Sequence, residues 1–132
     1  MLVLKETYTD WNGVERTEEV CFNLTKSELM QMEASEDGGL QKKIQSIIDS
    51  QDVNQIMTWF KEILLKSYGV ISDDGKRFRK NDEIRAAFEE SPIFDNLFMR
   101  LATDADAANK FINGIIPKDL VPNGPQAIPA NK

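Results

Sequence analysis

The stretch Asp52–Gly69, DVNQIMTWFKEILLKSYG, decides the fold of this chain of 132 residues. Its apolar residues recur every three or four positions, which is the spacing of an amphipathic helix. One face of that helix carries Val53, Ile56, Phe60, Ile63, Leu64 and Ser67. Leu65 falls nearly opposite this face, and Met57 and Trp59 lie at its two edges, so the helix is apolar on more than one side. The pattern therefore predicts a central helix that ends in a left-handed cap at Gly69.

Two shorter helices are predicted before the central one. Thr25 and Glu28 have the spacing of a capping box, in which a hydroxyl and a carboxylate each accept a hydrogen bond from a backbone N–H at the start of a helix. The pair Gly38-Gly39 then interrupts the chain. Beyond it, a second stripe at helical spacing is formed by Leu40, Ile44, Ile47 and Ile48.

Three helices are predicted after the central one, each with its own start signal. Asn81 followed by two acids opens the first, because negative charge is favourable at a helix N-terminus. Ser91 with Pro92 opens the second, and an aspartate variant of the capping box at Thr103–Asp106 opens the third, which Pro117 ends. The apolar stripes of the three helices are Ile84, Ala87 and Phe88; Phe94, Leu97, Phe98 and Leu101; and Ala108, Phe111, Ile112 and Ile115.

The N-terminus has the alternating pattern of a β-hairpin. The apolar residues of its two strands are Leu2, Leu4 and Tyr8, and Val20, Phe22 and Leu24. The segment Asp10–Gly13 between them contains Asn-Gly, a strong signal for a tight turn with positive φ. Most of the second strand is polar and is expected to face water. A two-stranded hairpin is only marginally stable alone, so it has to pack against the helices.

These patterns predict an α+β fold that is predominantly α-helical, with an N-terminal β-hairpin followed by about five or six helices. Residues 1–117 are expected to form a single helical domain with its hairpin. The stretch that begins at Pro117 holds four of the chain's five prolines and has no periodicity, so 118–132 is predicted to be a flexible tail or linker.

Composition argues against catalysis and against a membrane protein. The chain has no histidine, which removes the commonest general base and metal ligand, and no pair of acids stands out as catalytic. We therefore expect no enzyme activity, no cofactor and no metal. No stretch approaches the roughly 18 apolar residues that a membrane helix needs. A single cysteine, Cys21, excludes an internal disulfide framework and indicates a reducing, intracellular location.

The stretch Ser72–Lys80, SDDGKRFRK, concentrates basic residues in a chain whose net charge is −6. One interpretation is a structural connector: Asp74-Gly75 turns the chain, Val70-Ile71 and Arg77-Phe78 form two very short strands, and Phe78 enters the core. The other is a nucleic-acid site in which Phe78 stacks on a base. Because nucleic-acid-binding domains usually have a net basic face, the acidic balance favours the connector and no nucleic-acid partner.

Four residues are candidates for partner binding: Trp11, Met57, Trp59 and Leu65. Tryptophan is enriched in interface hot spots, although Trp11, beside the turn, also fits a cross-strand or lid aromatic. Methionine adapts to varied partner surfaces, but filling the core is its commoner role, and this holds for Met57 as well. Self-association is expected through an exposed apolar edge that involves Leu65 or Trp59.

Two segments resemble a known family. SYGVISDDGKRF at 67–78 and LFMRLATDADAANKFINGIIP at 97–117 are similar to the tail assembly chaperones of long-tailed bacteriophages, in the group encoded by phages and prophages of Gram-positive bacteria. The order of elements from Phe60 to Pro117 agrees with this resemblance. Before residue 53 no discriminating motif is found.

The resemblance implies a function without catalysis. Such proteins coat the long helical tape measure protein in the cytoplasm of the bacterial host before the tail tube polymerises around it, and they are absent from the finished virion. The family commonly makes a short product and a longer frameshifted one, and this chain fits the short product. The alternative is a phage structural subunit, of the tail or of head completion, that is retained in the particle.

Overall fold

The computed structural model describes residues 1–35 and 39–117. The N-terminal hairpin has the predicted form. Strand β1 (Leu2–Thr9) pairs antiparallel with β2 (Glu15–Phe22) along its whole length. In the turn, Gly13 has a φ of 84°, and its N–H donates to the carbonyl of Asp10 at 2.9 Å. The Asn-Gly signal therefore located the turn correctly.

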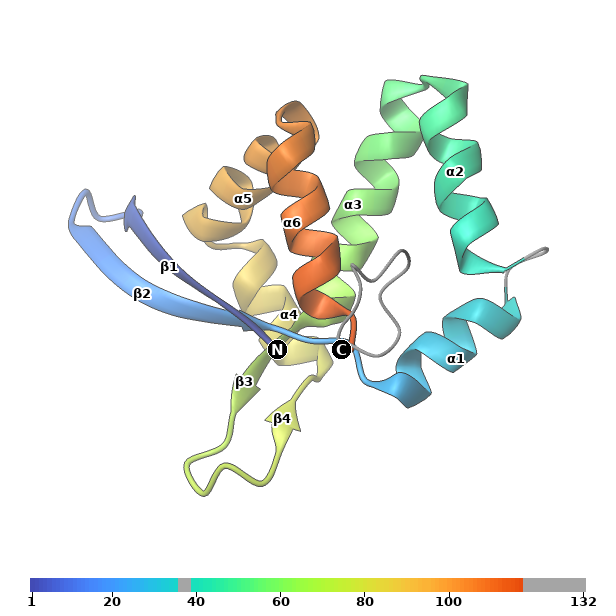
Figure 1. The fold of residues 1–132 in the computed structure, drawn as a ribbon. Coiled ribbons are helices and arrows are strands. Elements are labelled where there is room, and N and C mark those ends of the chain that lie inside the picture. Colours follow the sequence, from blue (N-terminus) through green and yellow to red (C-terminus); the bar gives the residue numbers. More distant parts are fainter. Residues whose placement is uncertain (36–38, 118–132) are drawn as a thin grey trace.

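The basic stretch forms a second, shorter hairpin that extends the sheet. Strand β3 (Tyr68–Ile71) pairs with the end of β2, and β4 (Phe78–Arg79) pairs with β3, which gives the order β1-β2-β3-β4. Gly75 turns the chain with a φ of 76°. The prediction of a structural connector is confirmed, although its second strand starts one residue later than expected. Figure 1 shows the two hairpins diverging from their point of contact.

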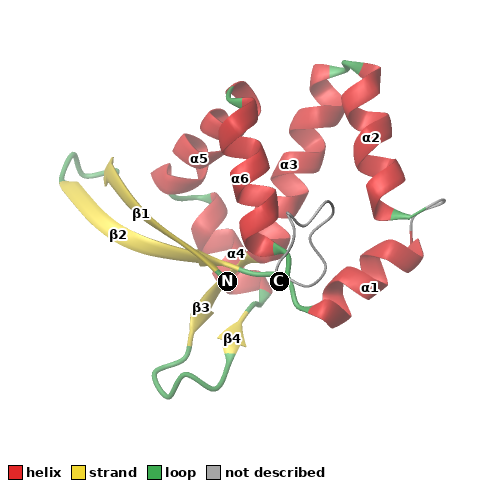
Figure 2. Cartoon of the chain, in the orientation of Figure 1, coloured by secondary structure: helices red, strands yellow, loops and turns green. Residues whose placement is uncertain are grey.

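Six helices complete the described residues, and the prediction of a mainly helical α+β fold is confirmed (Figure 2). Their bounds are α1 Lys26–Ser35, α2 Leu40–Ser50, α3 Val53–Ser67, α4 Asp82–Glu89, α5 Pro92–Thr103 and α6 Ala105–Ile115. The hairpin β1–β2 packs on α5 and α6, while α1 and α2 lie on the other side of α3 (Figure 1).

The start signals of the helices are confirmed with one correction. The Thr25 N–H donates to Glu28 Oε1 at 2.8 Å, and the Glu28 N–H donates to Thr25 Oγ1 at 3.1 Å. The side chains of Asn81 and Ser91 accept from the backbone as predicted. The last helix, however, is capped by Asp104 and not by Thr103, because α5 continues through Thr103 and only Asp104 has the extended backbone of a cap.

Helix α3 is central, as its pattern predicted. It contacts α2, α4 and α5, and buries Ile63, Leu64 and Ser67. Ser67 is accommodated in the core because its hydroxyl donates to the carbonyl of Ile63 at 2.6 Å. Leu65 is half-buried and packs against the core. Val53, expected on the apolar face, is 65% exposed because the first turn of α3 extends beyond the core.

The predicted left-handed cap at Gly69 is wrong. Helix α3 ends at Tyr68, whose backbone is extended, and the chain continues directly into β3. Gly69 lies within that strand opposite Cys21, and it has no positive φ. Its lack of a side chain has another cause: a Cβ atom there would lie 2.6 Å from the ring of Phe78. Phe78 thus covers the sheet at Gly69 but stays half-buried and outside the core cluster, so the prediction that it enters the core is wrong.

The core joins the hairpins to the helices around Phe22, which is fully buried. Its ring packs edge-on against those of Tyr68, Phe88 and Phe111, at centroid distances of 5.2 to 5.7 Å. Of the apolar stripes predicted after α3, only Ala87 is exposed. In the predicted stripe of α2, Ile47 is buried, whereas the side chains of Leu40, Ile44 and Ile48 are outside the described part.

The described helices are all too short or too polar to cross a membrane. The predicted flexible tail, 118–132, lies outside the described residues, so its nature stays a prediction.

Candidate functional site

A groove of about 370 Å³ lies between α1, α2 and α3. Its apolar floor is formed by Met32 from α1, Ile47 from α2, and Trp59 and Ile63 from α3. Polar side chains surround this floor: Ser35, Lys43, Asn54, Gln55, Thr58, Glu62 and Lys66. An apolar floor with a polar rim is typical of a site that binds another polypeptide or a small apolar ligand. We call this site the α3 groove.

Helix α3 supplies one whole side of the groove. The lining residues run from Asn54 to Lys66 at helical spacing, which corresponds to a length of roughly 18 Å at 1.5 Å per residue. The start of the helix is fixed by Asp52, whose side chain accepts hydrogen bonds from the N–H groups of Asn54 and Gln55. The Trp59 ring is held edge-on against Phe60, with centroids 5.4 Å apart. The groove is therefore built on a capped helix.

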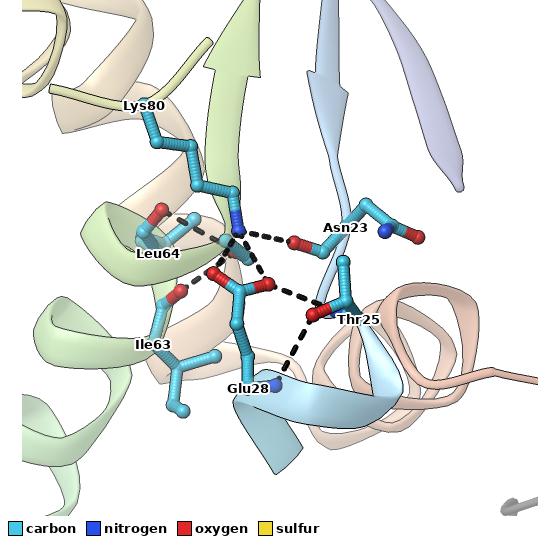
Figure 3. A network of polar contacts seen from close by, with 7 residues as sticks. Asn23, Thr25, Glu28, Ile63, Leu64 and Lys80 are labelled. Carbon is cyan, nitrogen blue, oxygen red and sulfur yellow. Dashed lines mark hydrogen bonds and ion pairs between the residues drawn. The ribbon is translucent and has the colours of Figure 1, made fainter. Parts of the chain in front are cut away.

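A polar network anchors the start of α1 beside the groove (Figure 3). The ammonium of Lys80, at the end of the β3–β4 hairpin, donates to both carboxylate oxygens of Glu28 at 2.9 Å and to the carbonyl of Asn23 at 2.7 Å. The Lys80 side chain is only 12% exposed and that of Glu28 is 32% exposed. Glu28 thus takes part in the capping box with Thr25 and in an ion pair at once.

The pKa of the Glu28 carboxyl reflects this arrangement. Burial alone raises the pKa, but the hydrogen bonds from the Thr25 N–H and from Lys80, with the positive charge of Lys80, outweigh burial and hold it below its usual range. The carboxylate is therefore ionised at neutral pH, and the ion pair is intact there.

The four predicted partner-binding residues are not brought together. Trp59 lines the α3 groove, Met57 is half-buried outside the groove lining, and Leu65 packs against the core. Trp11 lies at the tip of the β1–β2 hairpin and is 79% exposed. Its indole N–H donates to the carbonyl of Glu90 at 3.0 Å, so it contacts the end of α4 and not the opposite strand. The role of these residues in binding stays a prediction.

Sequence reasoning missed most of the groove. Ile63 was correctly assigned to the core stripe, and its side chain also reaches the groove. Nothing in the sequence places Met32 or Ile47 beside Trp59. The five methionines give a partial signal, because none of them is buried and Met30 is 71% exposed. The expectation that they mainly fill the core is therefore not supported.

The basic β3–β4 hairpin, Cys21 and the acidic side chains give weaker indications of a functional site than the α3 groove. Lys76, Arg77 and Arg79 are exposed on the β3–β4 hairpin, while Phe78 between them packs over Gly69. Burial raises the pKa of the Cys21 thiol, with a smaller contribution from Glu19, so this half-buried cysteine stays protonated. Within residues 1–35 and 39–117, no three His, Cys, Asp or Glu side chains are grouped as ligands for a metal ion.

The fold and the groove define a class: a small α+β domain with an open groove between α1, α2 and α3. The match to a family model gives the family. The model of the phage tail assembly chaperones covers residues 2–131, and the chain belongs to that family, whose members are generally not enzymes. No curated protein and no solved structure matches the chain. The family predicted from the two segments is confirmed, whereas an origin in phages of Gram-positive bacteria stays a prediction.

Proposed function

We propose that this chaperone binds the tape measure protein during tail assembly, in the cytoplasm of the bacterial host, and is absent from the mature virion. Family membership supports a partner from the phage tail. The observation that carries the proposal is the α3 groove, in which the half-buried Met32 and Trp59 line an open hollow above the buried Ile63. Tryptophan and methionine are enriched in the buried part of protein interfaces, and methionine adapts to successive segments of a long partner.

The dimensions of the α3 groove suit an amphipathic helix. Helix-in-groove binding uses apolar anchors at i, i+3 or i+4, and i+7, which span roughly 10 Å of helix. The groove is long enough for this set, and a volume of about 370 Å³ is enough for about three large side chains. The polar rim, including Glu62 and Lys66, then faces the polar sides of the bound helix.

Repetition along the partner supplies affinity in this proposal. A long tape measure protein offers many similar helical segments, so that many weak contacts of separate copies add up. Copies that also contact each other, in line with the expected self-association, strengthen the coat further. Residues 1–117 are proposed to act as one domain, with 118–132 as a linker or tail.

The test is co-expression with the tape measure protein of the same genome, followed by pull-down and light scattering. We expect a soluble complex with many chaperone copies per partner, and a severalfold loss of captured partner for Trp59→Ala. Val14→Ala is the control, because it truncates an exposed apolar side chain of the β1–β2 hairpin that is neither a partner-binding candidate nor part of the groove lining. A partner that stays insoluble with the intact chaperone contradicts the proposal. Detection of the chain in purified virions by mass spectrometry identifies a retained structural subunit instead.

A further inference from the structure

We infer that α1 is a gate on the α3 groove, and that the ion pair of Lys80 with Glu28 is the latch that holds this gate closed. The inference deepens the proposed function, because it concerns access to the same groove. It stands on three observations: where α1 lies, how its start is fastened, and what joins the arm formed by α1 and α2 to the rest of the chain.

Helix α1 forms the outer wall of the groove and reaches the main core through few residues, Leu29 with Met32 packed beside it. Met32 and Ser35 line the groove from its side, and only Leu29 is buried in the core. The outward residues are exposed, with Met30 at 71%. In Figure 1, α1 runs outward from the end of β2, and α2 lies above α1 and beside α3. Moving α1 outward would therefore uncover the floor of the groove and the apolar side of α1 together.

One ammonium group fastens the start of this helix. All three N–H donors of Lys80 are used: one on the carbonyl of Asn23, where the chain leaves β2, and two on the carboxylate of Glu28, in the first turn of α1. Lys80 follows β4, 52 residues away in sequence from Glu28. The contact thus ties α1 to a separate part of the fold (Figure 3). Charge-assisted hydrogen bonds in such a partly buried place are stronger than those of exposed pairs.

The arm has a turn with positive φ beyond α1 and another beyond α2. Gly39, before α2, has a φ of 91°, and Gln51, between α2 and α3, has a φ of 54°. A left-handed conformation is unfavourable for a residue such as Gln51. A change of its backbone angles to a right-handed conformation would therefore remove that cost. Changes of a few backbone angles at such positions are how hinged elements move.

The size of the groove shows why a gate is useful. The groove is open to solvent on one side and has a cavity volume of about 370 Å³, which suits side chains from one face of a bound helix. With α1 in place, the backbone of such a helix would lie at the mouth of the groove and not on its floor. With α1 displaced, Leu29 and Met32 join Trp59 and Ile63 as contact surface, and the partner helix itself fits against α3. Closing of the latch would then retain it.

The experiment uses the chaperone alone, so that it does not depend on the identity of the partner. Hydrogen–deuterium exchange is compared for the native chain, Lys80→Met and Glu28→Gln. Methionine keeps much of the lysine stem, and glutamine still accepts the hydrogen bond of the capping box. Lys61→Met is the control, because it breaks an exposed ion pair with Glu89, at 3.0 Å, that does not involve α1. Exchange in residues 26–35 is expected to become about tenfold faster in both latch variants and to stay unchanged in the control.

Fluorescence gives a second measurement. In a Trp11→Phe background Trp59 is the only tryptophan, and adding Lys80→Met is expected to make it more accessible to quenching by acrylamide. The inference is overturned if exchange in α1 is the same in all variants, if it rises equally throughout the molecule, or if quenching of Trp59 does not change. None of these outcomes bears on whether the tape measure protein is the partner, which the co-expression experiment decides.

Discussion

At Gly69 the identity of one residue decides how two segments meet. The ring of Phe78 lies where a side chain at this position would be, so the β3–β4 hairpin closes over a bare backbone. The sequence pattern predicted that Gly69 ends the central helix, and glycines at helix ends usually adopt a left-handed conformation. The close approach of an aromatic ring from nine residues later leaves no local trace, which is why the role of Gly69 could not be predicted.

Replacing Gly69 with alanine is expected to lower the free energy of unfolding by about 1 to 3 kcal/mol, the usual cost of overpacking. Urea denaturation measures this loss. Gly114→Ala is a comparison within a helix, where alanine is favoured. Its Cβ would also be crowded, 2.9 Å from Leu2 Cδ1 and 3.3 Å from Leu2 Cβ. Adding Phe78→Leu to Gly69→Ala is expected to restore part of the stability. A loss in the double variant as large as that in Gly69→Ala alone would show that Phe78 is not the cause.

Glu6 is the second residue whose surroundings the sequence did not reveal. It lies on the inner face of β1, in line with Leu2 and Leu4, and its side chain is 8% exposed. Arg100 from α5 donates to its two carboxylate oxygens at 2.7 and 3.1 Å. These bonds raise the pKa of Arg100, and they allow a carboxylate to lie between the hairpin and the helices.

An asymmetry between two variants is expected from this pair. Arg100→Met leaves a buried carboxylate without its partner and should lower the unfolding free energy by about 2 kcal/mol, less than for a fully buried pair because Arg100 is 46% exposed. Glu6→Gln leaves Arg100 free to turn toward water and should cost less. Thermal and urea unfolding at neutral pH measure both. A larger loss for Glu6→Gln would contradict this account of the ion pair.

Among the elements, α1 depends most on a single side chain. Glu28 accepts from Thr25 within its own helix and from Lys80 outside it, so the same carboxylate starts the helix and fixes its position. The capping box was visible in the sequence, because its two residues are three positions apart. The ion pair was not, because Lys80 belongs to a basic run whose members otherwise face water.

Ionisation of Glu28 should contribute to the pH dependence of the free energy of unfolding. Because its pKa is lower in the folded chain than the usual 4.5, the carboxylate stabilises the fold above about pH 4.5, and this contribution is lost as pH falls through the folded pKa. We expect it to be about 1 kcal/mol, since both side chains are partly exposed. Urea unfolding from pH 7 to pH 3 measures it. The decline should be smaller in Glu28→Gln; an unchanged decline would show that other acids account for it.

Element boundaries were predictable where local chemistry determines them. The Asn-Gly turn, the Thr25 capping box and the Ser91-Pro92 start all depend on residues within a few positions of each other, and all are found. The errors have long-range causes: Phe78 at Gly69, and the extension of α3 beyond the core at Val53. The predicted cap at Thr103 was wrong for a local reason. Two residues that can cap a helix are adjacent there, and Asp104 is the one that caps α6.

For the whole molecule, the candidate site was the least predictable feature. Trp59 was singled out as a partner-binding residue, but the groove around it exists only because α1 and α2 stand beside α3 at a distance set by tertiary packing. The family, by contrast, was predictable from two packing segments. Packing residues can therefore indicate the family of a chain without indicating the surface through which the chain binds its partner.

The hydrogen bond from the Leu24 N–H to the carbonyl of Ile115, at 2.9 Å, has a consequence for biosynthesis. The β1–β2 hairpin is translated before α5 and α6, which cover it. Until α6 is made, Phe22 lacks Phe111 and Leu24 lacks its hydrogen bond to Ile115, although Phe22 already has Tyr68 and Phe88 as neighbours. The nascent chain therefore keeps a partly uncovered apolar strand in solution until synthesis reaches α6, and a fragment that ends before α6 lacks that part of the core.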